Sequence, residues 1–162
     1  MTTILLLISL ISADPGSFEI KGVPFVKQES HFCGPAALAS VFTYYGLALD
    51  QGAIAQSVYT QKLGGALITD LQNYAQGKGL QTLLGQGTSD GIKNFLKEKR
   101  PVIVLVDLGF WVFSQPHYLV ITGFNDSGFI AHTGYEASRP FGYAEFEKIW
   151  KKKGSVYLLV WR

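Results

Sequence analysis

The sequence predicts an α+β fold, in which helices from the first half of the chain pack on a mostly antiparallel sheet from the second half. Residues 33–99 carry apolar residues at helical spacing between capping residues and glycines. Residues 101–161 instead hold runs rich in β-branched and aromatic residues, separated by turns such as NDSG; these runs are PVIVLVDL, HYLVITGF, FIAHTG and SVYLLVW. No internal repeat is visible, and helices followed by strands are typical of the α+β class.

The longest predicted helix runs from Cys33 to Tyr45. Gly34 is placed to cap it, Pro35 suits its first helical position, and Gly46 suits its exit. Its residues are apolar nearly all the way round, which predicts burial in the middle of the domain. The remaining expected elements are a short helix after Asp50 that reaches Val58, helices over 66–76, 89–99 and 143–150, and a strand over 80–84.

The bulk composition predicts one globular domain, which we place at residues 20–162. Hydrophobic residues make up 48% of the chain and charged residues 16%, which favours a buried core over disorder. The formal net charge of +2 is too small to indicate a nucleic acid or an anionic membrane as partner. Composition leaves the oligomeric state open.

The N-terminus is expected to be a signal segment over residues 1–13. Ile4–Ile11 is apolar but shorter than the ~20 residues of a membrane span. It resembles the apolar region of a secretory signal, with Ile11-Ser12-Ala13 as the cleavage site, although the usual positive residues before it are missing. We therefore expect export to the periplasm or the exterior, and the alternative is a buried strand in a cytoplasmic protein.

Cys33 is the only cysteine, so it forms no internal disulfide and is either a nucleophile or a buried apolar residue. Its place at a helix start favours the thiolate, which predicts a lowered pKa. His117 opens a strand after a loop and can serve as the base. Gln28 lies in a polar loop, where its amide could donate to an oxyanion, so we expect its replacement to alter rate but not stability.

Together these residues resemble family thirty-nine of the papain-clan cysteine peptidases, which includes the peptidases that trim double-glycine leaders from bacteriocins. The resemblance is carried by Gln28, four residues, then CGPAAL, and later by HYLVITG from His117, and it extends from Val23 to the C-terminus. It implies a papain-like fold and peptide-bond hydrolysis without metal or cofactor. It also implies that Cys33 is the nucleophile, His117 the general base and later the acid, and Gln28 part of the oxyanion hole, with a peptide or protein as substrate.

The sequence departs from this family where an aspartate usually orients the histidine. The corresponding residues are His132-Thr133-Gly134. We expect the Thr133 hydroxyl to hydrogen-bond the His117 ring as a neutral group, which stabilises the imidazolium less than a carboxylate does. Asp107, on the neighbouring strand, is the alternative orienting residue.

Several other interpretations of the sequence stay open or are disfavoured. A peptide-binding module without catalysis and an acyltransferase of the same clan are the rival functions. A zinc site built from His31, Cys33, His117 and His132 is disfavoured because the spacing matches no usual zinc pattern. The aromatic segment GFWVFSQP either covers the core or forms a wall of the substrate groove, and KIWKKKG is expected to be a solvated helix end.

Overall fold

The computed structural model describes residues 16–162, so the expected signal segment lies outside the described residues. The helices are α1 (Cys33–Tyr44), α2 (Gln51–Val58), α3 (Ile68–Gly77), α4 (Ser89–Lys97) and α5 (Tyr143–Lys151). The strands are β1 (Phe18–Glu19), β2 (Tyr59–Thr60), β3 (Gly65–Ala66), β4 (Gln81–Gln86), β5 (Val102–Asp107), β6 (Pro116–Phe124), β7 (Gly128–His132), β8 (Arg139–Gly142) and β9 (Val156–Trp161). Among residues 16–162, no helix is long and apolar enough to cross a membrane.

The central sheet has seven strands, and its pairings are antiparallel throughout. Six strands follow the order β4-β9-β5-β6-β7-β8, and β1 adds to the end of β6. A small hairpin, β2–β3, lies apart from this sheet. The predicted α+β class is confirmed, whereas β1, β2, β3 and β8 were not predicted because strands of two to four residues are too short to show a period of two.

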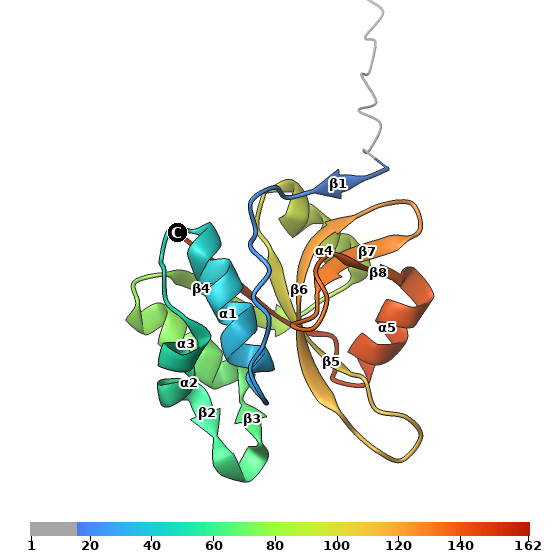
Figure 1. Cartoon of the computed structure of the whole chain (residues 1–162). Coiled ribbons are helices and arrows are strands. Elements are labelled where there is room, and N and C mark those ends of the chain that lie inside the picture. The colour runs from blue at the N-terminus through green and yellow to red at the C-terminus, as the bar shows by residue number, and fades with distance from the viewer. Residues whose placement is uncertain (1–15) are drawn as a thin grey trace, which may run out of the picture.

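Helices cover both faces of the sheet, as Figure 1 shows. In β5, Val102 and Val104 belong to the core shared with α4 and α5, while Ile103 belongs to the core shared with α1, α2 and α3. Alternate residues of the same strand are therefore buried on opposite sides. This explains why β5 reads as a continuous apolar run rather than as an alternating one.

Helix α1 starts one residue earlier than its expected cap. Phe32 occupies the capping position without a side-chain hydrogen bond, so the expectation that Gly34 caps the helix is wrong. Pro35 is the third residue of the helix and not, as expected, the first. Gly34 has another role, because a Cβ at this position would lie 3.2 Å from the ring of Tyr118 in β6 and 3.3 Å from Ala66. The missing side chain thus lets β6 and β3 approach the first turn of α1, where Cys33 is located.

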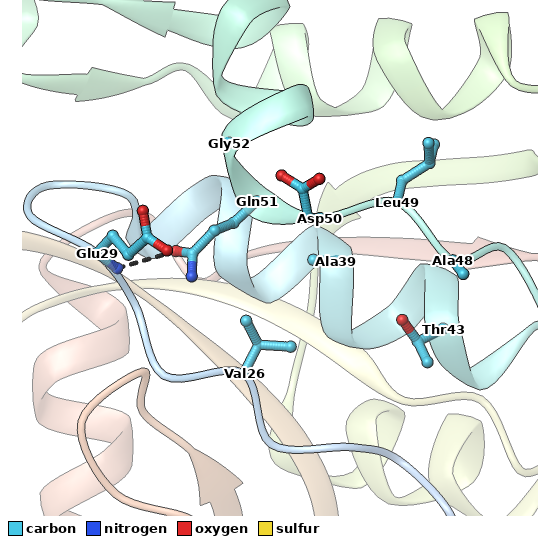
Figure 2. Close-up of a pocket in the computed structure, with 9 residues that line it drawn as sticks. All are labelled: Val26, Glu29, Ala39, Thr43, Ala48, Leu49, Asp50, Gln51 and Gly52. Atoms are coloured by element: carbon cyan, nitrogen blue, oxygen red, sulfur yellow. Dashed lines mark hydrogen bonds between the residues drawn. The ribbon is translucent and has the colours of Figure 1, made fainter.

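The segment before α1 is held by Gln51, the first residue of α2 (Figure 2). The Gln51 Oε1 accepts a hydrogen bond of 2.9 Å from the main-chain N–H of Glu29, and its Nε2 donates one of 2.8 Å to the carbonyl of Lys27. Both neighbours of Gln28 are therefore fixed to α2. This arrangement positions Gln28 on the approach to Cys33.

Candidate active site

Cys33 is the first residue of α1 and is half-buried. Burial raises the pKa of its thiol, and main-chain hydrogen bonds from Tyr118, Gly34 and Cys33 itself only partly oppose this effect. The expectation of a lowered pKa is therefore wrong in direction: the helix start does favour the thiolate, but desolvation outweighs it. The contact with Tyr118 places the thiol beside the residue that follows His117 in β6.

We expect alkylation of Cys33 by iodoacetamide to be slow at pH 7 and to rise through a midpoint above the pKa of an ordinary cysteine. A raised pKa lowers the thiolate fraction at neutral pH, and the thiolate is the reactive species. The rate constant is measured against pH for the native protein and for the same chain in urea, which should titrate near the ordinary value of ~8.5. A native midpoint below that of the unfolded chain would contradict the effect of burial.

His117 is the second residue of β6, opposite Val106 of β5, and only 3% of its surface is exposed. Its Nε2 lies 2.6 Å from the main-chain carbonyl oxygen of Thr133. Because a carbonyl oxygen only accepts hydrogen bonds, Nε2 carries the proton. Burial lowers the pKa of His117, which favours the neutral ring, and Nδ1 of that ring is left as a hydrogen-bond acceptor.

Thr133 thus contacts His117 through its main chain and not, as expected, through its hydroxyl. The Thr133 Oγ1 instead accepts hydrogen bonds from the main-chain N–H groups of Tyr135 (3.1 Å) and Glu136 (2.8 Å). The hydroxyl closes the turn that presents the carbonyl to the ring. Its influence on His117 is indirect.

We expect Thr133→Val to lower the free energy of unfolding by about 2 kcal/mol, because two main-chain donors lose their acceptor. Thr133→Ser keeps the oxygen and is the matched control, with a stability near that of the unchanged chain. Denaturant unfolding measures both variants, and the ring nitrogen shifts of His117 report the tautomer. A change of tautomer in Thr133→Val without any loss of stability would restore the hydroxyl as the orienting group.

Asp107, the alternative orienting residue, is engaged elsewhere. Its Oδ1 accepts hydrogen bonds of 2.8 Å from the main-chain N–H groups of Gly109 and Gln115, and its Oδ2 accepts one of 2.6 Å from the Ser114 hydroxyl. Burial acts to raise the pKa of Asp107, but these hydrogen bonds and Lys153 hold it well below its usual range. Asp107 therefore anchors the loop between β5 and β6.

The side chain of Gln28 lies against the turn that follows β7. Its Nε2 donates hydrogen bonds to the Ser30 carbonyl (3.0 Å) and the Tyr135 hydroxyl (3.1 Å), and its main-chain N–H donates to the Gly134 carbonyl (2.9 Å). Its Oε1 is the buried side-chain polar atom that has no partner among residues 16–162. A Cβ on Gly134 would lie 2.5 Å from this oxygen, and Gly134 has φ +82°. Both the lack of space and the backbone conformation therefore require glycine here.

Tyr135 is a site residue that the sequence did not indicate. Its ring stacks on the His117 ring, with centroids 5.6 Å apart and an interplanar angle of 12°, while its hydroxyl accepts from Gln28. It therefore joins two of the predicted site residues. The only available signal was its position two residues after Thr133, since a tyrosine in a polar turn has no distinctive pattern of its own.

A cavity of about 450 Å³ opens beside Cys33 and fits an apolar group, because most of its lining is apolar. It is lined by Cys33, residues 63–69 of the β2–β3 region, Leu105, Pro116, Tyr118 and Lys153. Pro116 and Tyr118 flank His117 in β6. A second hollow, of about 460 Å³, lies beside α1 and the start of α2 and is rimmed by Glu29 and Asp50 (Figure 2), but neither Cys33 nor His117 lines it.

Within the described part of the chain, no group of three or more histidine, cysteine, aspartate or glutamate side chains could hold a metal ion. His132 has a structural role, because its Nδ1 accepts from the main-chain N–H of Ser138 (3.0 Å) and its Nε2 donates to the carbonyl of Val23 (3.0 Å). Both of its ring nitrogens are engaged with the main chain.

Four apolar residues of the β5–β6 loop, at positions 110–113, neither cover the core nor line the cavity beside Cys33. Their side chains face solvent, with exposed fractions of 85% for Phe110, 88% for Trp111, 76% for Val112 and 78% for Phe113. Both expectations are therefore wrong for the aromatic residues of this segment, although Pro116 at its end does line the cavity. The loop is anchored at its base by Asp107, and its tip projects from the fold.

A known protein family matches most of this chain. The sequence profile of the Peptidase_C39 like family matches residues 20–158. The chain belongs to this family. Its C39-like fold supports a peptidase-type function in general, and no curated protein sequence matches the chain.

Solved structures share the C39-like fold at low sequence identity. The peptidase domain of Streptococcus ComA, a bifunctional ABC transporter of a quorum-sensing pathway, has a TM-score of 0.73 and 21% identity over 86% of this chain and 98% of that one. A double-glycine-motif protease of an AMS/PCAT transporter, solved with its leader peptide, has a TM-score of 0.72 and 19% identity over 89% and 94%. A C39-like protein from Bacillus anthracis, described as a peptidase, has a TM-score of 0.74 and 14% identity over 90% and 98%.

Proposed function

We propose that this C39-like protein is a cysteine peptidase in which Cys33 is the nucleophile and His117 is the general base. The observation that carries the proposal is the 2.6 Å contact between His117 Nε2 and the Thr133 carbonyl. This contact holds the proton on Nε2 and leaves Nδ1 as the acceptor that a general base needs. The thiol at the start of α1 contacts the main chain of the adjacent residue, Tyr118.

The directions of the two pKa shifts support a particular order of proton transfer. Both groups are neutral at rest, since burial raises the pKa of Cys33 and lowers that of His117. His117 Nδ1 therefore takes the thiol proton as the sulfur attacks the carbonyl carbon, and a preformed ion pair is not required. The protonated ring then gives the proton to the leaving amine. In the second half of the reaction it activates the water that hydrolyses the acyl-enzyme.

The oxyanion of the tetrahedral intermediate is assigned to the Gln28 amide and the main-chain N–H of Cys33. In the structure both N–H groups of the Gln28 amide are engaged, with Ser30 and with the Tyr135 hydroxyl. The bond to Tyr135 has to be exchanged for one to the oxyanion. Tyr135 is 59% exposed, so it can move aside when a substrate enters.

The substrate is proposed to be a peptide that places an apolar side chain in the cavity beside Cys33. The cavity's volume of about 450 Å³ lies within the range of ordinary ligand sites, and its lining is mostly apolar. One structural neighbour was solved with its leader peptide, which agrees with a peptide ligand for this fold. The rest of an extended peptide substrate would then run along the β2–β3 hairpin, which lines the cavity.

A peptidyl chloromethyl ketone tests this proposal. Its ketone mimics the scissile carbonyl, so it should alkylate Cys33 in the native protein, and mass mapping should find the adduct on that residue. His117→Ala should slow this reaction much more than it slows alkylation by iodoacetamide, because only the ketone needs the imidazole and the oxyanion donors. Equal slowing of both reagents would argue against a catalytic pair, and no adduct at all would favour the peptide-binding module.

A further inference from the structure

The tip of the β5–β6 hairpin carries an apolar surface that the proposed catalysis does not use. We call the side chains of Phe110, Trp111, Val112 and Phe113 the aromatic tip; each is at least three-quarters exposed. Contiguous apolar surface on a soluble fold marks an interaction site. The tip projects on the same side of the molecule as the β2–β3 hairpin, at the lower end of Figure 1, where Leu63 and Leu67 are also exposed.

Two lysines that follow α5 contact the base of the aromatic tip. The Lys152 Nζ donates a hydrogen bond of 3.0 Å to the Gly109 carbonyl, and the Lys153 Nζ donates one of 2.9 Å to the Ser114 hydroxyl. Together with Lys148 and Lys151 on the same helix end, they form what we call the lysine collar. The carboxylates that pair with the collar are Glu147, 3.4 Å from Lys151, and Asp107, 3.4 Å from Lys153, so the four lysines of the collar outnumber these two carboxylates.

We propose that the aromatic tip inserts into the headgroup region of an anionic lipid bilayer, with the lysine collar against the lipid phosphates. Tryptophan and phenylalanine favour this interface, and lysines near an anionic surface add attraction that the whole-chain charge of +2 conceals. The tip is a convex projection, so a protein partner would need a matching pocket. A fluid bilayer accepts a projection without one.

Docking in this way would turn the cavity beside Cys33 toward the membrane. Lys153 belongs both to the collar and to the lining of the cavity beside Cys33, so the two surfaces are contiguous. Leu63 and Leu67 line the same cavity and are exposed on the opposite hairpin. Peptides held at a bilayer surface would therefore meet the cavity without a further reorientation of the protein.

Vesicle binding by the full chain tests the proposal without any need for catalytic activity. We expect co-sedimentation with vesicles of equal parts phosphatidylglycerol and phosphatidylcholine, and much weaker binding to phosphatidylcholine alone or in 0.5 M salt. Trp111→Ser should weaken binding by about tenfold or more. Trp111→Phe should retain it, and Leu83→Ser, at an exposed leucine outside the tip, is the matched control.

Lysine substitutions test whether the lysine collar, rather than the positive charge of the whole protein, binds the membrane. Replacing three collar lysines by glutamine should weaken binding by about 100-fold at low salt. The same number of substitutions at exposed lysines outside the collar should have a smaller effect. The collar variant changes Lys148, Lys151 and Lys152, and the control variant changes Lys21, Lys78 and Lys99. Equal effects of the two sets would contradict a specific contact between the lysine collar and the lipid phosphates.

Trp111 also reports its own surroundings. Its emission should shift to the blue when anionic vesicles are added and should be quenched by brominated lipids, and both signals should be absent in Trp111→Phe. This local signal distinguishes the tip from Ile4–Ile11, which is itself apolar. The proposal is overturned if Trp111→Ser binds vesicles normally. It is also overturned if that substitution removes a dimer seen by sedimentation velocity, or raises the KM for a peptide when no vesicles are present.

Discussion

Cys33→Ala is expected to abolish peptide hydrolysis, and His117→Ala is expected to lower it to nearly the same residual rate. In the proposed mechanism the two residues act in one step, because a neutral thiol would attack only as Nδ1 of His117 removes its proton. Loss of either member of such a unit costs as much as ~10⁶ in kcat. The measurement is kcat for a peptide substrate in each single variant and in the double variant.

The double variant decides whether the two residues form a unit. It should be no slower than either single variant, since each substitution alone already removes the coupled step. His132→Ala is the control for loss of a buried histidine, because both ring nitrogens of His132 are engaged with main-chain groups. Losses that multiply in the double variant would show two independent contributions and would contradict the pair.

Gln28→Met is expected to lower kcat by ~10²–10³, the usual effect of removing one oxyanion donor. Methionine keeps the length of the side chain but has no N–H to donate. The structure also corrects the expectation that Gln28 is neutral for stability. Its side chain is buried and donates to both Ser30 and Tyr135, so we expect a loss of about 1 kcal/mol in the free energy of unfolding.

Tyr135→Phe is the matched control for this effect. It removes the hydroxyl that accepts from Gln28 and keeps the ring on His117. If Gln28 acts on the oxyanion, Tyr135→Phe should keep kcat near or above its normal value, because a donor is released. If Tyr135→Phe reproduces the loss seen in Gln28→Met, then Gln28 acts by holding Tyr135, and the oxyanion assignment is wrong.

Much of the fold could be predicted from local patterns. The bounds of α2 and α4 follow from capping residues and apolar spacing, and β5, β6 and β9 follow from runs of apolar residues with many β-branched members. The covering of both faces of the sheet could not be predicted in the same way. A continuous apolar run shows that a strand is buried on both sides, but it does not show which helices provide the cover.

By itself the sequence indicated Gln28, Cys33 and His117 as candidate site residues, because each lies in a short local pattern, but it did not indicate Tyr135. Only the tertiary structure decided how these residues are held. A main-chain carbonyl such as that of Thr133 has no residue-specific signal, and its contact with His117 depends on the pairing of β6 with β7. The direction of the Cys33 pKa likewise depends on burial by distant segments, which outweighs the local effect of the helix start.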